Sequence, residues 1–131
     1  LDVLTMAIGG LGSISLLVGG VGIVTIMTIA VAERTGEVGL MLALGAQRRT
    51  ILGLFLGEAV VLAVLGGAMG LALGIGLAQL IHAFVPALPV HTPVGYAVLA
   101  VALSAVIGLT AGVLPARRAS RLDPVESLRA E

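Results

Sequence analysis

Three long apolar segments dominate the chain. A cluster of charge divides the first from the second, and a short stretch with two histidines and two prolines, residues 82–91, divides the second from the third. Residues 3–32 carry no charged side chain, residues 50–81 carry only Glu58, and residues 92–116 carry none. A helix needs about 20 predominantly apolar residues to cross about 30 Å of hydrocarbon, and each segment exceeds that length. The pattern therefore predicts three transmembrane helices, at about residues 10–32, 53–80 and 94–115.

The first segment is longer than a membrane requires, and Thr, Gly and Ser dilute the apolar residues of its N-terminal part. We expect that part to continue as helix beyond the outer face of the membrane.

The composition supports an all-α integral membrane protein. Hydrophobic residues make up 59% of the 131 residues and charged residues 11%, whereas a soluble domain carries about 25% charged residues. So few charges cannot cover the apolar surface of a soluble fold, and lipid is the expected solvent. The predicted fold class is three transmembrane helices with one short helix between the first two.

The seven basic residues predict the orientation. Three lie between the first two spans and four follow the third, while the N-terminus and residues 82–93 contain none. Because cytoplasmic loops of membrane proteins are enriched in Lys and Arg, residues 33–49 and the tail, residues 116–131, are expected in the cytoplasm. The N-terminus is then outside and the C-terminus inside.

Several classes of chemistry are disfavoured. A formal net charge of zero gives no electrostatic case for nucleic-acid binding. All seven basic residues are arginine, so the chain lacks the lysine of a P-loop. With no Cys and two His, we expect no metal site and no cofactor. An intramembrane enzyme is also disfavoured, because no catalytic constellation is present.

Small residues recur every fourth position in the second and third spans. Such ridges let helix backbones approach closely in lipid. The alternative is that Gly and Ala are simply common in membrane helices. The residues expected to pack are Gly66, Gly70 and Gly74 in the second span and Ser104, Gly108 and Gly112 in the third.

Glu58 is the only charge within the second apolar segment. A carboxylate inside the membrane is expensive and is a functional candidate by default. However, it follows Arg49 by only about 13 Å along a helix axis. Two hypotheses therefore stay open: a structural role near the cytoplasmic interface, including a pair with an arginine, or a role in transport or gating.

The segment between the first two spans predicts a short helix, over residues 36–44. Thr35 is a plausible N-cap, Glu37 suits the first turn, and Gly45 suits the C′ position that ends a helix. A helix of this length is unstable alone, and its residues are strongly apolar. It must therefore be buried against a partner protein or lie flat in the membrane interface.

The tail predicts a second short helix. Pro115 suits a helix end or kink, and Asp123 followed by Pro124 reads as a cap with proline at the first helical position. Arg117, Arg118 and Arg121 suit the anionic cytoplasmic lipid surface. The tail is either a solvated anchor that fixes topology or a contact for a partner protein.

Two stretches resemble the MacB/FtsX-like ABC transporter permeases. The first stretch is the segment between the first two spans, with Glu33-Arg34-Thr35, Glu37-Val38-Gly39 and Ala43-Leu44-Gly45-Ala46. The second is the tail from Leu114 to Arg129. Residues Phe55 to Ala59 also resemble the segment that opens the family's next span. The resemblance implies a coupling helix that docks on a separate ATPase subunit or domain, a homodimer, and an extracytoplasmic domain that could contact a further partner. It implies four spans, of which this chain would hold the last three.

One position departs from the family pattern. Family members often carry basic residues where this chain has Met41 and Leu42, so docking would rest on apolar burial and nearby arginines. Leu42→Asp is expected to abolish ATPase association while leaving insertion intact. The residues expected to serve coupling are Glu33, Arg34, Thr35, Glu37, Gly39, Leu42, Leu44, Gly45, Arg48 and Arg49.

Two functions follow. The leading hypothesis is a non-catalytic permease subunit of an ABC-type transporter in the cell inner membrane, coupling ATP hydrolysis by a partner to export or to a mechanical signal. The alternative is a stand-alone small membrane protein that oligomerises through its glycine ridges as a channel or scaffold.

Overall fold

The computed structural model describes residues 2–86, 91 and 93–129 of the chain, and these residues form helices without any strand. The all-α prediction is confirmed. The helices are α1 (Asp2–Glu33), α2 (Thr35–Ala43), α3 (Arg48–Phe84), α4 (Val94–Ser120) and α5 (Pro124–Arg129). Among them α1, α3 and α4 are long and apolar enough to cross a membrane, which confirms the three predicted spans.

The long helices extend beyond the predicted spans. Helix α1 begins at Asp2, as expected for a helix that emerges from the membrane, and α3 begins at Arg48 instead of near residue 53. Of residues 82–93, which contain no basic side chain and lie between the second and third predicted spans, residues 87–90 and 92 lie outside the described residues.

Pro115 does not end the third span. It lies inside α4, which continues to Ser120. A proline removes one backbone hydrogen bond and crowds the preceding turn, and in membrane helices it is tolerated where neighbouring helices hold it. Pro115 is almost completely buried. The first residues of the predicted tail, 116–120, are therefore part of a packed helix.

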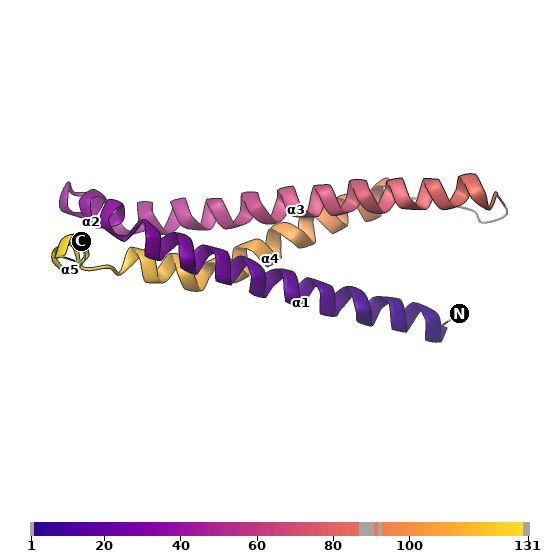
Figure 1. The fold of residues 1–131 in the computed structure, drawn as a ribbon, viewed down its shortest axis with the longest axis horizontal. Helices are drawn as coiled ribbons and strands as arrows, with labels where there is room; N and C mark the ends of the chain where they lie inside the picture. Colours follow the sequence, from indigo (N-terminus) through magenta and orange to yellow (C-terminus); the bar gives the residue numbers. More distant parts are fainter. Residues whose placement is uncertain (1, 87–90, 92, 130–131) are drawn as a thin grey trace.

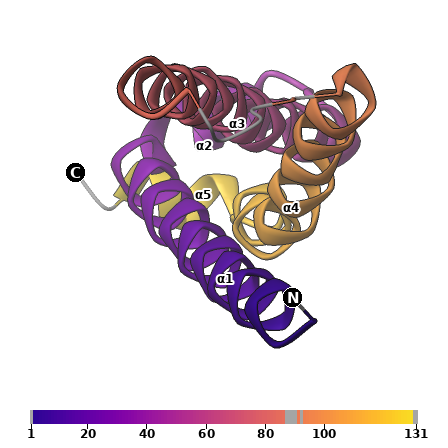
Figure 2. The same cartoon turned by 90° about the vertical axis from the view of Figure 1, so that its right-hand side faces the viewer.

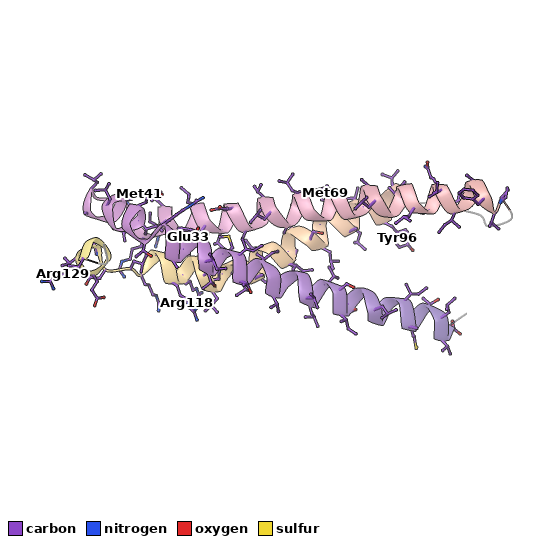
Figure 3. The ribbon with its side chains drawn as sticks, in the orientation of Figure 1. Glu33, Met41, Met69, Tyr96, Arg118 and Arg129 are labelled. Atoms are coloured by element: carbon purple, nitrogen blue, oxygen red, sulfur yellow. The ribbon has the colours of Figure 1, made fainter. Side chains whose placement is uncertain are left out.

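The long helices form an open bundle (Figure 1). Helix α3 packs most extensively against α4, and α1 packs mainly against α4. Toward its N-terminus α1 diverges from α3 (Figure 2). At the opposite end α2 and α5 pack against each other where α1 ends, α3 begins and α4 ends. We call this the arginine-bearing end; Arg118 and Arg129 lie there, and Tyr96 lies toward the other end (Figure 3).

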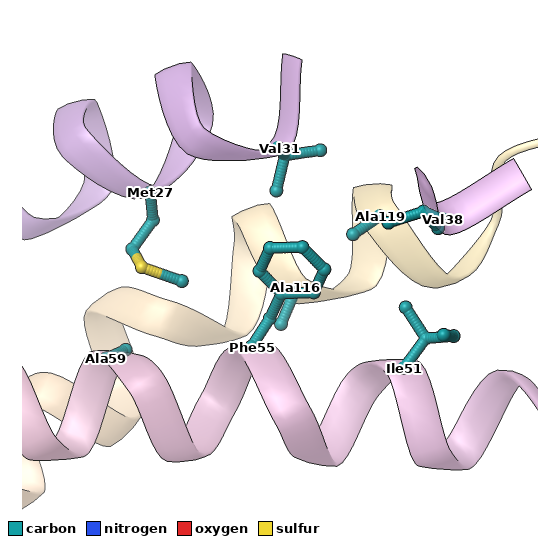
Figure 4. Packing of buried hydrophobic residues seen from close by; sticks show 8 residues of the cluster. All are labelled: Met27, Val31, Val38, Ile51, Phe55, Ala59, Ala116 and Ala119. Atoms are coloured by element: carbon teal, nitrogen blue, oxygen red, sulfur yellow. The ribbon is translucent and has the colours of Figure 1, made fainter. Parts of the chain in front are cut away.

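The buried core lies at the arginine-bearing end, and α1 to α4 all contribute to it (Figure 4). Farther along the bundle, large apolar side chains such as Leu11, Met69 and Val98 are more than 60% exposed. Outward-facing apolar side chains are what a lipid-facing helix requires, because no burial within the chain is needed there. The core residues are Met27, Val31, Val38, Ile51, Phe55, Ala59, Ala116 and Ala119.

The two small-residue ridges differ in their contacts within this chain, because the ridge of α4 packs closely against α3 and the predicted ridge of α3 does not meet α4. A Cβ added at Gly108 would lie 2.5 Å from the Ala63 Cβ, and one at Gly112 would lie 2.5 Å from the Ala59 Cβ. Ser104 faces Gly67 on α3.

On α3, therefore, the ridge that meets α4 is Ala59, Ala63 and Gly67. The predicted ridge of Gly66, Gly70 and Gly74 is exposed, and nothing lies within 4 Å of a Cβ added at any of the three. Both series repeat every fourth residue, and they differ by one residue, or about 100° around the helix. The closed core at the arginine-bearing end turns the Ala59 side of α3 inward.

Candidate functional site

Helix α2 packs against the bundle through one narrow face. Val38 is 1% exposed and Gly39 is buried. In Figure 4 the Val38 side chain lies beside Ala119 of α4, with Ile51 of α3 facing the same space. We call this buried contact of Val38 with α3 and α4 the seat of α2. A nine-residue helix is marginal by itself, so the seat and the packing of α5 on α2 together keep it helical.

The start of α2 corrects the predicted cap. Its N-cap is Arg34, without a side-chain hydrogen bond, and Thr35 is already helical. The Thr35 hydroxyl instead donates to the backbone carbonyls of Val31 (3.0 Å) and Ala32 (2.8 Å) at the end of α1. Only one residue separates the two helices, so the last carbonyls of α1, which lack helical partners, lie within reach of this hydroxyl.

The end of α2 confirms the predicted C′ glycine. Gly45 has φ +94°, and its amide donates to the Leu42 carbonyl at 3.1 Å. The Ala46 amide donates to the Met41 carbonyl at 2.9 Å. These two bonds define a Schellman motif, which ends α2 and directs the chain into α3.

Gly45→Ala is expected to weaken this turn by about 1 kcal/mol, because a Cβ is disfavoured at positive φ. No atom lies within 4 Å of the added Cβ, so backbone strain is the only cost. Hydrogen exchange at the Leu44 and Ala46 amides should accelerate. Gly53→Ala is the control, because Gly53 also has open space but lies in regular helix; an equal acceleration there would contradict the strain argument.

The outer face of α2 is apolar and open. Leu40 is 51% exposed and Leu44 is 80% exposed. Leu42 is different, because it is half-buried and packs against the core. A change at Leu42 would therefore disturb the seat of α2 as well as its outer surface, whereas Leu44 reports on the outer surface alone.

Glu58 pairs with Arg34. The Arg34 Nη1 lies 3.6 Å from the Glu58 Oε2, with the two side chains 49% and 32% exposed. The pair joins the α1–α2 junction to α3. Of the roles left open by the sequence, the geometry provides the arginine pair.

The other arginines surround the same end. Arg48, Arg49, Arg117, Arg118 and Arg121 are all exposed. Arg48 and Arg49 lie in the first turn of α3, where the helix dipole disfavours positive charge. They therefore do not serve helix stability, which leaves lipid headgroups or a partner as their expected contacts.

Helix α5 is capped as predicted, but the sequence did not reveal that it packs against α2. The Val125 amide donates to the Asp123 Oδ1 at 2.9 Å, with Pro124 at the first helical position. The helix packs against α2, and the preceding Leu122 packs against the core. The apolar Leu122 just before the cap was the one indication that the tail returns to the bundle.

Among the residues that the structure describes, no group of three or more His, Cys, Asp or Glu could hold a metal ion. The candidate site is the surface made of α2, α5 and the surrounding arginines.

Comparison with known proteins gives a consistent result. Residues 9–124 match the family model described as FtsX-like permease C-terminal. The macrolide export ATP-binding/permease protein MacB of Azoarcus sp. (strain BH72) is 45% identical over 134 residues, which cover 99% of this chain and 20% of that protein. The MacB protein of Wolinella succinogenes gives the same identity and coverage. That of Agrobacterium fabrum is 43% identical over 95% of this chain and 19% of its own length. The chain thus spans about a fifth of these relatives.

Proposed function

Because the chain belongs to the FtsX-like permease family, we propose that it is the non-catalytic membrane part of an ABC-type transporter, which converts ATP hydrolysis on a partner ATPase subunit or domain into movement across the membrane. The relatives are named as ATP-binding/permease proteins. The chain has no lysine with which to form a P-loop, so ATP binding belongs to another part or subunit. Export or the transmission of a mechanical signal would then be the work of the assembled transporter.

The arginine-bearing end is the cytoplasmic end in this proposal. All seven arginines lie on segments that meet there, which is the distribution that the positive-inside rule requires. The protein is then a multi-pass protein of the cell inner membrane with its N-terminus outside. The surface made by α2 and α5 faces the compartment that contains ATP.

The open apolar face of α2 is the observation that carries the proposal. Leu44 is 80% exposed and Leu40 is 51% exposed, so the described residues leave most of the first side chain and half of the second uncovered. A helix that lies on the anionic cytoplasmic leaflet usually carries Lys or Arg on its polar face. Helix α2 has none and carries Glu37. This charge favours a protein partner over lipid, and the partner we propose is the ATPase.

Leu44→Asp tests this docking. Burying a leucine side chain is worth about 2 kcal/mol, so we expect at least a tenfold loss of affinity for the ATPase encoded with this chain. Affinity is measured by titrating the purified ATPase onto the chain in lipid nanodiscs. Leu44→Met, which keeps the apolar contact, should bind within about twofold of the parent. Unchanged binding of Leu44→Asp would exclude the outer face of α2 as the contact.

The alternative of an oligomeric channel or scaffold is favoured by one feature, the exposed Gly66–Gly70–Gly74 ridge of α3. A ridge of this kind accepts a second helix at close range, which also suits the proposed homodimer. The two hypotheses differ in the partner: a channel or scaffold needs no ATPase and would retain its oligomeric state and activity in the Leu44→Asp variant.

A further inference from the structure

We propose that Arg34 and Glu58 are a positioning pair that holds α2 at a fixed angle to the bundle, and that Glu58 acts through this pair and not as a transport carboxylate. The functional meaning of the inference rests on the proposed ATPase docking, because a docking helix can move the spans only if it cannot swing independently of them.

The α1–α2 junction has one residue in which to turn. The Arg34 amide donates to the Ala30 carbonyl at 3.1 Å, and the Val38 amide donates to the Arg34 carbonyl at 3.0 Å. Together with the Thr35 hydroxyl bonds to α1, these bonds join the ends of the two helices. They do not fix the rotation about Arg34 itself, whose φ and ψ of −101° and 17° lie outside the regular helical values.

The Arg34 side chain adds a restraint at this junction to those that the Val38 seat and α5 already provide. It reaches across to α3 and meets Glu58 at 3.6 Å. Glu58 is held in place by its own helix, because Phe55 one turn before it is 2% exposed and its neighbour Ala59 is fully buried. The pair therefore ties the one turning residue to the most firmly packed part of α3.

The position of the pair explains why both charges are needed. Removing Arg34 leaves the Glu58 carboxylate, which is 32% exposed, at the edge of an apolar span without a partner, and an unpaired charge near hydrocarbon is costly. Removing Glu58 leaves an arginine whose long side chain can reach water. We therefore expect Arg34→Gln to disturb α2 more than Glu58→Gln.

The test uses the absence of cysteine from the chain. Val38→Cys places a thiol under α2, at a site that is 1% exposed, and Leu44→Cys places one on its outer face, at a site that is 80% exposed. Maleimide labelling of the Val38→Cys variant, with the chain in nanodiscs and no ATPase present, measures how often α2 leaves its seat. Ala119→Cys, which is fully buried beneath α2, provides a second reporter should the change at Val38 itself loosen the helix.

In the Val38→Cys background we expect labelling to accelerate about fivefold when Glu58→Gln is added and more when Arg34→Gln is added. In the Leu44→Cys background the same two changes should leave the labelling rate constant. The exchanged pair, Arg34→Glu with Glu58→Arg, should restore protection of the buried thiol to within about twofold of the parent, because only a pair can be rescued by exchange. Arg49→Gln, a change at an exposed arginine at the start of α3, is the control and should leave the buried thiol protected.

Continued protection of the buried thiol in both single variants, or an exchanged pair that labels as fast as the singles, would overturn the inference. These results are independent of ATPase docking. If docking fails while the pair controls labelling, the proposed function is wrong and the positioning pair stands. If Leu44→Asp abolishes docking while labelling is constant in every variant, the proposed function stands and the positioning pair is wrong.

Discussion

Gly108→Val is expected to destabilise the helical bundle by about 3 kcal/mol, the upper range for overpacking a close contact. The first added carbon would lie 2.5 Å from the Ala63 Cβ, 2.8 Å from the Ala59 carbonyl oxygen and 3.2 Å from the Val60 Cα. Two of these atoms belong to the α3 backbone, which cannot move aside as a flexible side chain can. The helices must therefore separate, and the contact that extends from Gly108 to Gly112 is lost.

Gly70→Val is the matched control. Gly70 also lies in the middle of a span, and both substitutions change the helix propensity by the same small amount. However, no atom lies within 4 Å of a Cβ at Gly70. Unfolding of the purified monomer in mixed micelles should therefore show a large loss of stability for Gly108→Val and less than about 0.5 kcal/mol for Gly70→Val. Equal losses would mean that α3 turns its Gly66–Gly70–Gly74 ridge toward α4.

This comparison also shows where prediction from the sequence ends. Rules that act within a few residues were sufficient for the three spans, for the glycine that ends α2, and for the Asp123 cap of α5. Each of these depends on local hydropathy or on one backbone conformation. None requires knowledge of which helix lies alongside.

The sequence was not sufficient where neighbouring helices decide the contact. Two small-residue series run along α3, and only the position of α4 selects Ala59, Ala63 and Gly67 over the glycines one residue away. Thr35 has the right type for an N-cap, but the end of α1 lies so near that its hydroxyl bonds backward to Val31 and Ala32.

The packing of α5 on α2 is a third case that the sequence could not supply. In the sequence α2 precedes α3 and α5 follows α4, so their contact depends on how α3 and α4 pack together. At the candidate site, the residue types and the helix were predictable, and the side of α2 that stays open was not.

Phe55→Ala is expected to cost about 3 kcal/mol and to release α2 from the bundle. Phe55 is 2% exposed and is among the largest fully buried side chains, and it lies between Met27 and Val31 of α1, Ala116 of α4 and its own helix (Figure 4). Deleting a buried aromatic side chain loses its transfer free energy and leaves a cavity, typically at a cost of about 3–5 kcal/mol. Small alanines at Ala59, Ala116 and Ala119 line this region and cannot expand to fill the space.

The chain supplies its own control, because it contains only two phenylalanines and the other, Phe84, ends the same helix. Phe84 is 81% exposed, so Phe84→Ala should change the stability by less than about 0.5 kcal/mol. Unfolding in mixed micelles measures both variants, and ATPase binding is then measured in nanodiscs. If α2 depends on this core for its seat, Phe55→Ala should weaken binding although Phe55 itself is buried and cannot touch a partner. A Phe55→Ala variant with reduced stability and full ATPase affinity would show that α2 docks without its seat, and that the core at the arginine-bearing end serves the bundle alone.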